Sequence, residues 1–199
     1  MADMVKLSEN ELNILSSFFP EGKEITLKII QKRTNLSYEP VHRIMKQLVG
    51  KKLLLERKFG KTFVYSLDFT KEKIKIAFII YANKRKEKFE EDYSQIYKAL
   101  SKVYEEDIDF LAVFGSYAKS NPTKHSDIDI FCVGPNRNKL ESKIRGLRYE
   151  TNLEFSPVIM PKSEFAKIKK ENEQFWKDLV EYGIVFKGYE LFYYYAYIK

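Results

Sequence analysis

Two short stretches of the sequence combine residue types that could bind a phosphate and a cation. Residues 108–114 form a nearly continuous apolar run, typical of a buried strand, and Gly115 and Ser116 follow it at once. Glycine lets the backbone approach an anion closely. Free N–H groups at the start of a following helix point toward that anion, and a serine hydroxyl adds another donor. By itself such a segment is more often a simple turn than a phosphate site.

A pair of aspartates gives this turn more weight. Ten residues separate Ser116 from Asp127, and Asp127 and Asp129 stand at the start of a second apolar run, residues 126–133. Side chains two residues apart on a strand project from the same face. Neighbouring carboxylates repel unless a cation lies between them, and Mg²⁺ prefers a few carboxylates together with phosphate oxygens and water. The alternative is that Asp127 caps the strand and Asp129 faces solvent.

A third carboxylate is available further along the chain. Residues 151–160 predict another strand, in which Glu154 could lie beside the aspartates. Three acidic groups on adjacent strands can hold two metal ions. One ion would activate an attacking hydroxyl and the other would hold the leaving pyrophosphate. Glu154 could equally be a surface residue, and the sequence does not separate the two interpretations.

The segment Gly-Ser-Tyr-Ala-Lys at 115–119, followed by Ser-Asp-Ile-Asp at 126–129, resembles the signature of the polymerase-beta-type nucleotidyltransferases. The likeness is greatest to the minimal nucleotidyltransferases of prokaryotes, which include antitoxin-like members and members fused to a winged helix. The resemblance implies that Gly115 and Ser116 hold a nucleoside triphosphate and that Asp127 and Asp129 bind Mg²⁺. It also implies that Glu154 is a general base or second-metal ligand.

Two residues near this signature, Lys119 and Ser120, allow more than one interpretation. Lys119 is a candidate for contact with a phosphate, or a lysine on a helix surface. Ser120 replaces a glycine that the family often has after the Ala-Lys pair. A side chain disfavours left-handed backbone by roughly 1 kcal/mol or more, which bears on the loop geometry and on catalytic competence more than on nucleotide binding.

The N-terminal region is basic and has a different pattern. Residues 28–61 contain ten Lys and Arg but only Glu39 and Glu56, a formal charge of +8 in a chain of net charge +7. Apolar spacing and caps predict helices near residues 8–19, 26–34 and 37–49. Strands at 53–57 and 62–67 with a tip at 58–61 follow. From about residue 8 to 68 this order resembles the winged helix-turn-helix family.

That second resemblance implies binding of duplex DNA. The third helix would enter the major groove, and the hairpin, or wing, would touch phosphates. The candidate DNA-binding residues are Arg43, Lys46 and Gln47 on the helix and Arg57, Lys58 and Lys61 on the wing. The alternative is a solvated basic surface on a protein–protein module.

We therefore predict an α/β (α+β) protein of two domains. Residues 1–70 would form the winged helix-turn-helix domain. Residues 71–199 would form a connecting helix and a minimal nucleotidyltransferase fold, with a small mixed sheet flanked by helices. The aromatic stretch 189–197 is interpreted as a packing cluster or a homodimer contact, with stacking on a nucleobase as the alternative.

Bulk properties exclude several classes of protein. The chain is 44% hydrophobic and has no apolar run long enough to cross a membrane. Residues 1–6 lack the apolar core of a signal peptide, so we expect a cytoplasmic protein. The single cysteine, Cys132, excludes an internal disulfide and a cysteine-cluster metal site, and its apolar surroundings predict a small core residue.

The sequence is compatible with two functions. The first is a magnesium-dependent transferase that moves a nucleoside monophosphate from a triphosphate such as ATP to an unknown acceptor, which could be a protein such as a partner toxin. The second is a DNA-binding regulator or antitoxin whose nucleotidyltransferase fold serves as a nucleotide sensor or an oligomerisation module.

Overall fold

The computed structural model describes residues 7–104 and 106–198, which divide into two compact units. Unit 1 ends at Tyr81, and unit 2 is Ala82–Tyr197. The division falls inside one long helix, α4 (Glu72–Asp92). Its first turns pack within unit 1, where Ile74 and Phe78 are buried and the Phe78 ring lies 5.3 Å from that of Phe19. Its last turns pack within unit 2, where the Phe89 and Phe186 rings meet at 5.6 Å.

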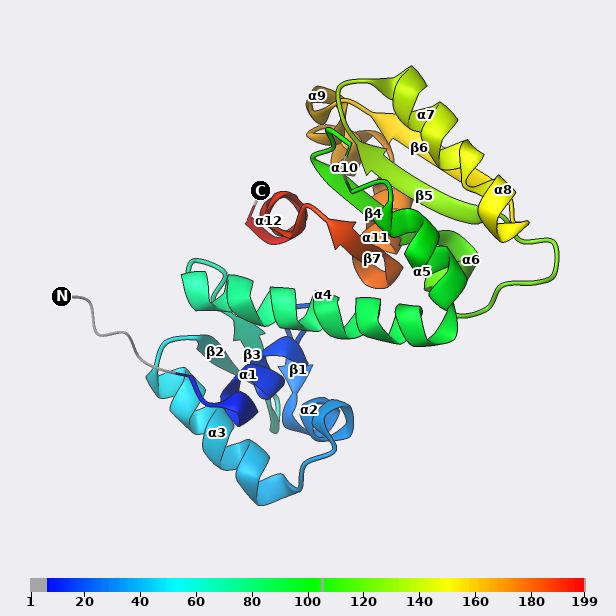
Figure 1. Ribbon diagram of the computed structural model, residues 1–199. Helices are drawn as coiled ribbons and strands as arrows, with labels where there is room; N and C mark the ends of the chain where they lie inside the picture. Colours follow the sequence, from blue (N-terminus) through cyan, green and yellow to red (C-terminus); the bar gives the residue numbers. More distant parts are fainter. Residues whose placement is uncertain (1–6, 105, 199) are drawn as a thin grey trace. The chain divides into compact units, whose positions relative to one another are not determined.

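Unit 1 contains the three helices and the β-hairpin that the sequence predicts (Figure 1). Its sheet has the order β1-β3-β2, with β3 antiparallel to both neighbours. The helix α3 turns an apolar stripe of Val41, Ile44, Met45 and Leu48 into the core, which leaves its opposite face to solvent. The elements are α1 (Glu9–Ser16), β1 (Ile25–Thr26), α2 (Leu27–Thr34), α3 (Tyr38–Gly50), β2 (Leu54–Phe59) and β3 (Thr62–Leu67).

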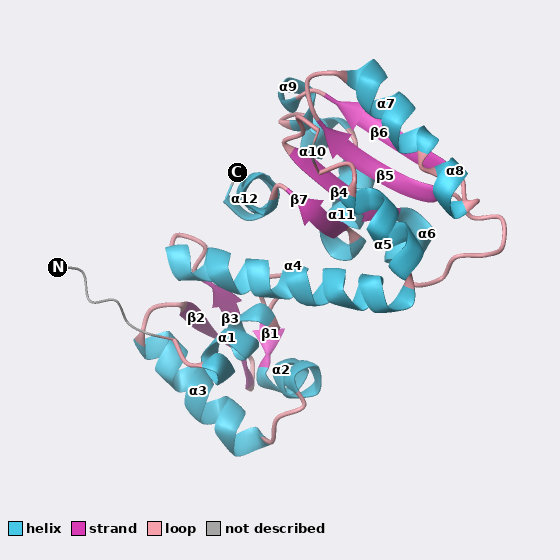
Figure 2. Ribbon diagram, viewed as in Figure 1, coloured by secondary structure: helices cyan, strands magenta, loops and turns pink. Residues whose placement is uncertain are grey.

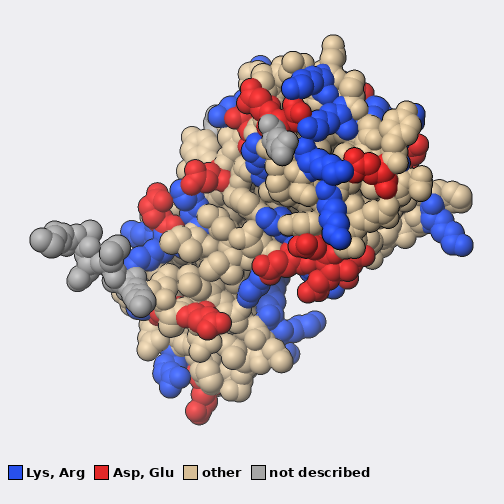
Figure 3. Space-filling view, in the orientation of Figure 1, with Lys and Arg blue, Asp and Glu red and all other residues tan. Residues whose placement is uncertain are grey.

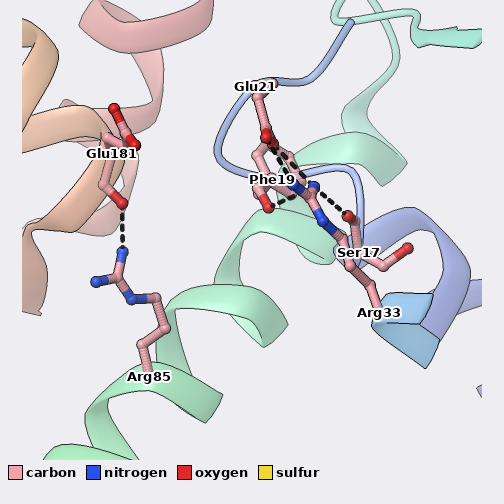
Figure 4. Close-up of polar contacts among 6 residues, drawn as sticks. All are labelled: Ser17, Phe19, Glu21, Arg33, Arg85 and Glu181. Atoms are coloured by element: carbon pink, nitrogen blue, oxygen red, sulfur yellow. Dashed lines mark hydrogen bonds and ion pairs between the residues drawn. The ribbon is translucent and has the colours of Figure 1, made fainter. Parts of the chain in front are cut away.

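Two polar networks fix the N-terminal helices. The predicted capping box is present: the amide of Ser8 donates to Glu11 Oε2 at 2.9 Å, and the amide of Glu11 donates to Ser8 Oγ at 3.3 Å. Arg33 of α2 binds Glu21 through both terminal nitrogens, at 2.6 and 2.8 Å, and donates to the carbonyl of Ser17 at 2.9 Å (Figure 4). Arg33 is therefore a structural tie between α2 and the loop after α1.

Unit 2 is built on a four-stranded mixed sheet of order β6-β5-β4-β7 (Figure 2). The pair β5–β6 is parallel and the other two pairs are antiparallel, as the prediction of a small mixed sheet requires. The strands are β4 (Phe110–Phe114), β5 (Ile128–Val133), β6 (Phe155–Met160) and β7 (Ile184–Lys187). The helices are α5 (Ser94–Ser101), α6 (Gly115–Ala118), α7 (Arg137–Gly146), α8 (Arg148–Thr151), α9 (Lys162–Phe165), α10 (Ile168–Glu171), α11 (Glu173–Tyr182), α12 (Tyr189–Tyr193) and the π-helix Tyr194–Ile198.

Helices cover both faces of this sheet. Aliphatic side chains fill the face under α5 and α7, where Leu100, Ile144 and Ile130 belong to one buried cluster. Cys132 lies in the same cluster, so its prediction as a core residue is confirmed. Aromatic rings fill the opposite face, where Phe192 of α12 stacks on Phe110 at 5.3 Å.

The C-terminal aromatic stretch thus contributes at least Phe192 to internal packing. Within unit 2, the second half of α4 is tied to the end of α11, because Arg85 donates to the carbonyl of Glu181 at 3.0 Å (Figure 4). No helix among residues 7–104 and 106–198 is long and apolar enough to cross a bilayer.

Candidate functional site

The glycine of the Gly-Ser turn lies against the second aspartate. Gly115 has a φ of +67°, in the region that favours glycine, at the junction of β4 and α6. A Cβ atom at this position would overlap Oδ2 and Cγ of Asp129. Phe114 and Asp129 are cross-strand partners, which explains the close approach of the turn to the carboxylate. The two motifs singled out by the sequence are therefore brought together by the β4–β5 ladder.

The paired aspartates lie at the N-terminal end of β5, an interior strand of the sheet. Asp129 is partly buried on β5 and Asp127 is exposed just before the strand. Burial, and then the charge of Asp127, raise the pKa of the Asp129 carboxyl. Alternation along β5 puts Asp129 on the face of Phe131, away from the aliphatic cluster that contains Ile130. The carboxylates thus lie where the aromatic face of the sheet ends.

The backbone at Ser120 shows what geometry the loop after α6 adopts with serine in place of glycine. Its φ of +56° is left-handed, the conformation for which glycine is the usual residue. The Ser120 amide donates to the carbonyl of Tyr117 at 3.1 Å, and the Asn121 amide donates to the carbonyl of Ser116 at 3.0 Å. These two bonds are the Schellman termination of a helix. The serine therefore strains the turn without changing its geometry.

Lys119 is engaged with α11. Its Nζ lies 2.9 Å from Oδ2 of Asp178 and 4.8 Å from the centre of the Tyr182 ring. The pairing lowers the pKa of Asp178. Contact of Lys119 with a triphosphate would require it to leave Asp178, and in the structure it serves to hold α6 against α11.

Glu154 aligns with the aspartates by strand register. Ile128 pairs with Phe155 and Asp129 with Ser156 in the parallel ladder, so one step back along both strands sets Asp127 beside Glu154. The amide of Ile128 donates to the Glu154 carbonyl at 2.8 Å, which fixes that backbone. The Glu154 side chain is 63% exposed, and its Oε1 lies 3.7 Å from Nη1 of Arg148.

The donor set fits Mg²⁺. Among the described residues, no three His, Cys, Asp or Glu side chains stand close enough together to hold a metal ion. Mg²⁺ needs only one or two carboxylates when substrate phosphates and water complete its octahedron. Asp127 and Asp129 supply carboxylate oxygens as donors. Burial and then the charge of Asp127 raise the pKa of Asp129, and a bound cation would offset both effects.

The predicted DNA-binding residues of unit 1 lie on the surface, and two of the six are paired with acids. Lys46 binds Glu56 at 2.8 Å, and Arg57 binds Glu24 at 2.7 Å. In the part of the chain that the structure describes, Arg43, Lys58 and Lys61 are exposed and form no ion pair. Figure 3 likewise shows Lys and Arg interleaved with Asp and Glu on the face drawn.

The formal charge of +8 is therefore partly cancelled by acids outside residues 28–61. Glu11, Glu21 and Glu24 pair with Lys51, Arg33 and Arg57. A count along the sequence could not include them, because each pair joins residues at least 12 positions apart.

Two exposed features escaped the sequence analysis. On the wing, the Phe59 side chain is 70% exposed. Beside Glu154, Tyr149 is 78% exposed and stacks with Arg148. Both residues resemble core positions by type alone. The available signal was their place, next to a predicted hairpin tip and five residues before a candidate carboxylate.

One protein-family model matches part of unit 2. Residues 93–188, just under half of the chain, match the family model of the nucleotidyltransferase domain. The matched segment contains the Gly-Ser turn, both aspartates and Glu154, and it supports a nucleotidyltransferase of the polymerase-beta type in unit 2. No curated protein matches the chain.

Proposed function

We propose that unit 2 is a magnesium-dependent nucleotidyltransferase that transfers a nucleoside monophosphate from a triphosphate to an acceptor hydroxyl. The observation that carries this proposal is the apposition of Gly115 and Asp129, which leaves no room for a side chain between the turn and the carboxylate. The turn would receive the triphosphate through Ser116 and the amides at the start of α6. Asp127 and Asp129 would hold Mg²⁺, which neutralises charge on the phosphates.

In this proposal the carboxylates have separate roles. Asp129, fixed in the β4–β5 ladder, sets the position of the metal relative to the turn. Asp127, exposed two residues before Asp129, completes the pair. Glu154, beside Asp127 in the strand register, would accept the proton of the acceptor hydroxyl. Catalysis of this kind depends mainly on positioning and charge stabilisation, which a strand-borne site supplies.

We also propose that unit 1 is a winged helix-turn-helix that binds duplex DNA. The order of its helices and strands and the exposed, unpaired Arg43, Lys58 and Lys61 support this proposal. Gln47, also exposed on α3, would contact base edges beside Arg43. The acceptor of the transfer could be a protein partner, and the protein could form homodimers.

A regulator that only senses nucleotide is the second candidate. The observation that favours it is the ion pair between Glu154 and Arg148, which engages the carboxylate that chemistry would need. A sensor would bind Mg²⁺–triphosphate at Asp127 and Asp129 and alter DNA binding without turnover.

One experiment tests the proposal for unit 2. Each α-labelled nucleoside triphosphate is incubated with the protein and Mg²⁺, with and without cell extract, and labelled product is sought. The Asp127→Asn/Asp129→Asn variant should lose both product and Mg²⁺-dependent triphosphate binding. The matched control is Asp107→Asn/Asp109→Asn. It removes two carboxylates that precede β4, at the end of the strand opposite to the Gly-Ser turn.

The control should behave as wild type. Equal calorimetric affinity of wild type and the Asp127→Asn/Asp129→Asn variant for Mg²⁺–ATP would refute the metal site. Binding without any labelled product from wild type would select the sensor instead.

A further inference from the structure

The short helix α8, which precedes Glu154 and β6, carries Arg148 and Tyr149, and Arg148 lies against Glu154. Tyr149 is 78% exposed, the largest fraction among the large hydrophobic side chains that the structure describes. The guanidinium carbon of Arg148 lies 4.9 Å from the centre of the Tyr149 ring, and Nη2 donates to the Tyr149 hydroxyl at 3.0 Å. Nη1 of Arg148 lies 3.7 Å from Glu154 Oε1. Arg148 therefore links the exposed ring to the third carboxylate.

The backbone beneath Tyr149 is held firmly, although the ring is in solvent. Thr151 is buried, and its Oγ1 donates to the carbonyl of Leu147 at 3.2 Å. Gln95 of α5 reaches across to donate to the carbonyl of Glu150 at 3.1 Å. The exposure of the ring is thus a property of an anchored turn. A rigid, solvent-facing aromatic ring is suited to contact with a ligand.

We propose that Arg148 and Tyr149 bind the acceptor and that the acceptor is the end of a single-stranded nucleic acid. This proposal rests on the proposed function of unit 2. An aromatic ring stacks on any nucleobase, and a guanidinium binds phosphate through paired N–H groups. One nucleotide offers both a base and a phosphate next to a terminal hydroxyl. A hydroxyl on a protein side chain offers neither.

The same arginine couples acceptor binding to the chemistry. Exposed ion pairs contribute little to stability, so an acceptor phosphate can displace Glu154 from Arg148 at small cost. The freed carboxylate accepts the proton of the terminal hydroxyl. The hydroxyl oxygen bonds to the α-phosphorus of the triphosphate, the bond from that phosphorus to the bridging oxygen breaks, and pyrophosphate leaves. The strand is thereby longer by one nucleotide.

The test measures binding and turnover separately, in full-length protein. The background is Lys58→Ala/Lys61→Ala, which weakens binding of nucleic acid by unit 1. Anisotropy follows a fluorescent single-stranded oligonucleotide, in one arm RNA and in the other DNA, each with a free 3′ hydroxyl. Tyr149→Ala should weaken binding about tenfold, the scale for losing one stacked base. Tyr149→Phe should retain binding, because it keeps the ring.

Steady-state transfer to the same oligonucleotides gives the second readout. Tyr149→Ala should raise KM for the oligonucleotide about tenfold and leave KM for the triphosphate unchanged. Arg148→Ala should raise the oligonucleotide KM as well. The matched control is Tyr194→Ala, which removes another exposed tyrosine of unit 2, 47% exposed, and should change neither constant.

The outcomes distinguish the acceptor proposal from the proposed function of unit 2 on which it rests. The acceptor site is refuted if Tyr149→Ala has the same oligonucleotide affinity and oligonucleotide KM as wild type. It is also refuted if protein is the only molecule labelled in extract. In both cases continued turnover of triphosphate leaves the proposed function standing. If no acceptor is labelled by wild type, the proposed function fails. The anisotropy of Tyr149→Ala against wild type then decides by itself whether the ring binds nucleic acid.

Discussion

The carboxylate of Asp129 occupies the space that a Cβ atom on Gly115 would fill. A glycine is required there on two counts, because its φ of +67° is also unfavourable for any other residue. The turn and the aspartate are therefore fitted to each other, and a change in either must move both.

Gly115→Ala should thus damage function and stability together. We expect a loss of roughly 1–2 kcal/mol in unfolding free energy from the backbone alone. The displaced Asp129 should weaken Mg²⁺–triphosphate binding by at least about tenfold, or about 1.4 kcal/mol. Calorimetry and denaturant unfolding measure the two effects. The control is Gly146→Ala, where a Cβ meets nothing within 4 Å. Unchanged triphosphate affinity in Gly115→Ala would contradict the fit described here.

The raised pKa of Asp129 predicts a cost in stability that metal should relieve. Burial and the charge of Asp127 make the folded protein hold the Asp129 proton more tightly than the unfolded chain does. Metal-free protein should therefore lose stability as pH rises from the ordinary aspartate range through the raised pKa. Asp129→Asn removes this loss.

Tm is measured in chelator for both proteins. The Tm of Asp129→Asn minus that of wild type should be larger at pH 7 than at pH 4. Added Mg²⁺ and triphosphate should stabilise wild type alone. A Tm difference that is the same at both pH values would show that Asp129 carries no electrostatic penalty.

The strained loop end at Ser120 offers a stabilising substitution. Glycine adopts the observed φ of +56° without the steric conflict of a side chain, and the two Schellman hydrogen bonds use only backbone atoms. We expect Ser120→Gly to raise the unfolding free energy by about 1 kcal/mol, as measured by urea denaturation. Asn152→Gly is the comparison, since asparagine tolerates its φ of +56° better than serine does. An equal gain at both sites, or none at Ser120, would argue against strain as the cause.

Glu154→Gln separates a catalytic from a sensory site. The substitution keeps the shape of the side chain and removes its charge. Triphosphate binding should stay within about tenfold of wild type, or about 1.4 kcal/mol. Turnover should fall by about a hundredfold or more, the scale for losing a general base. Rates are compared at saturating Mg²⁺, and transfer as fast as wild type would exclude Glu154 as the base.

Binding of DNA by unit 1 should depend most on the unpaired cations of the wing. Replacing Lys58 and Lys61 with alanine should weaken binding to every duplex and reduce the slope of log K against log salt by about two. Arg57→Ala should have a smaller effect, because Arg57 is already paired with Glu24. Gel shifts at several salt concentrations measure this, with Lys169→Ala/Lys170→Ala in unit 2 as the control. Equal effects of the two double variants would exclude the wing as the DNA contact.

The sequence predicts the parts of this molecule that depend on local pattern. The capping box at Ser8, the hairpin and the strand that carries Asp129 all follow from spacing over a few residues. Side-chain pairing between distant segments was not predictable in this way. Lys119 and Asp178 are 59 residues apart, and their ion pair depends on how α11 packs, which no short motif encodes. Ser120 shows the same limit, since hydrogen bonds of the turn outweigh the preference of the residue.

The pairing of Phe114 with Asp129 also bears on the order in which the site assembles. Gly115 and Ser116 begin the connection between the antiparallel strands β4 and β5, Asp127 ends it, and Asp129 follows on β5, so a short loop closure is enough to bring them together. Glu154 joins only after the chain has crossed over through α7 and α8 to form a parallel pair. Contacts close in sequence form faster than distant ones. The Gly-Ser turn and the two aspartates are therefore expected to come together earlier in folding than Glu154 joins them.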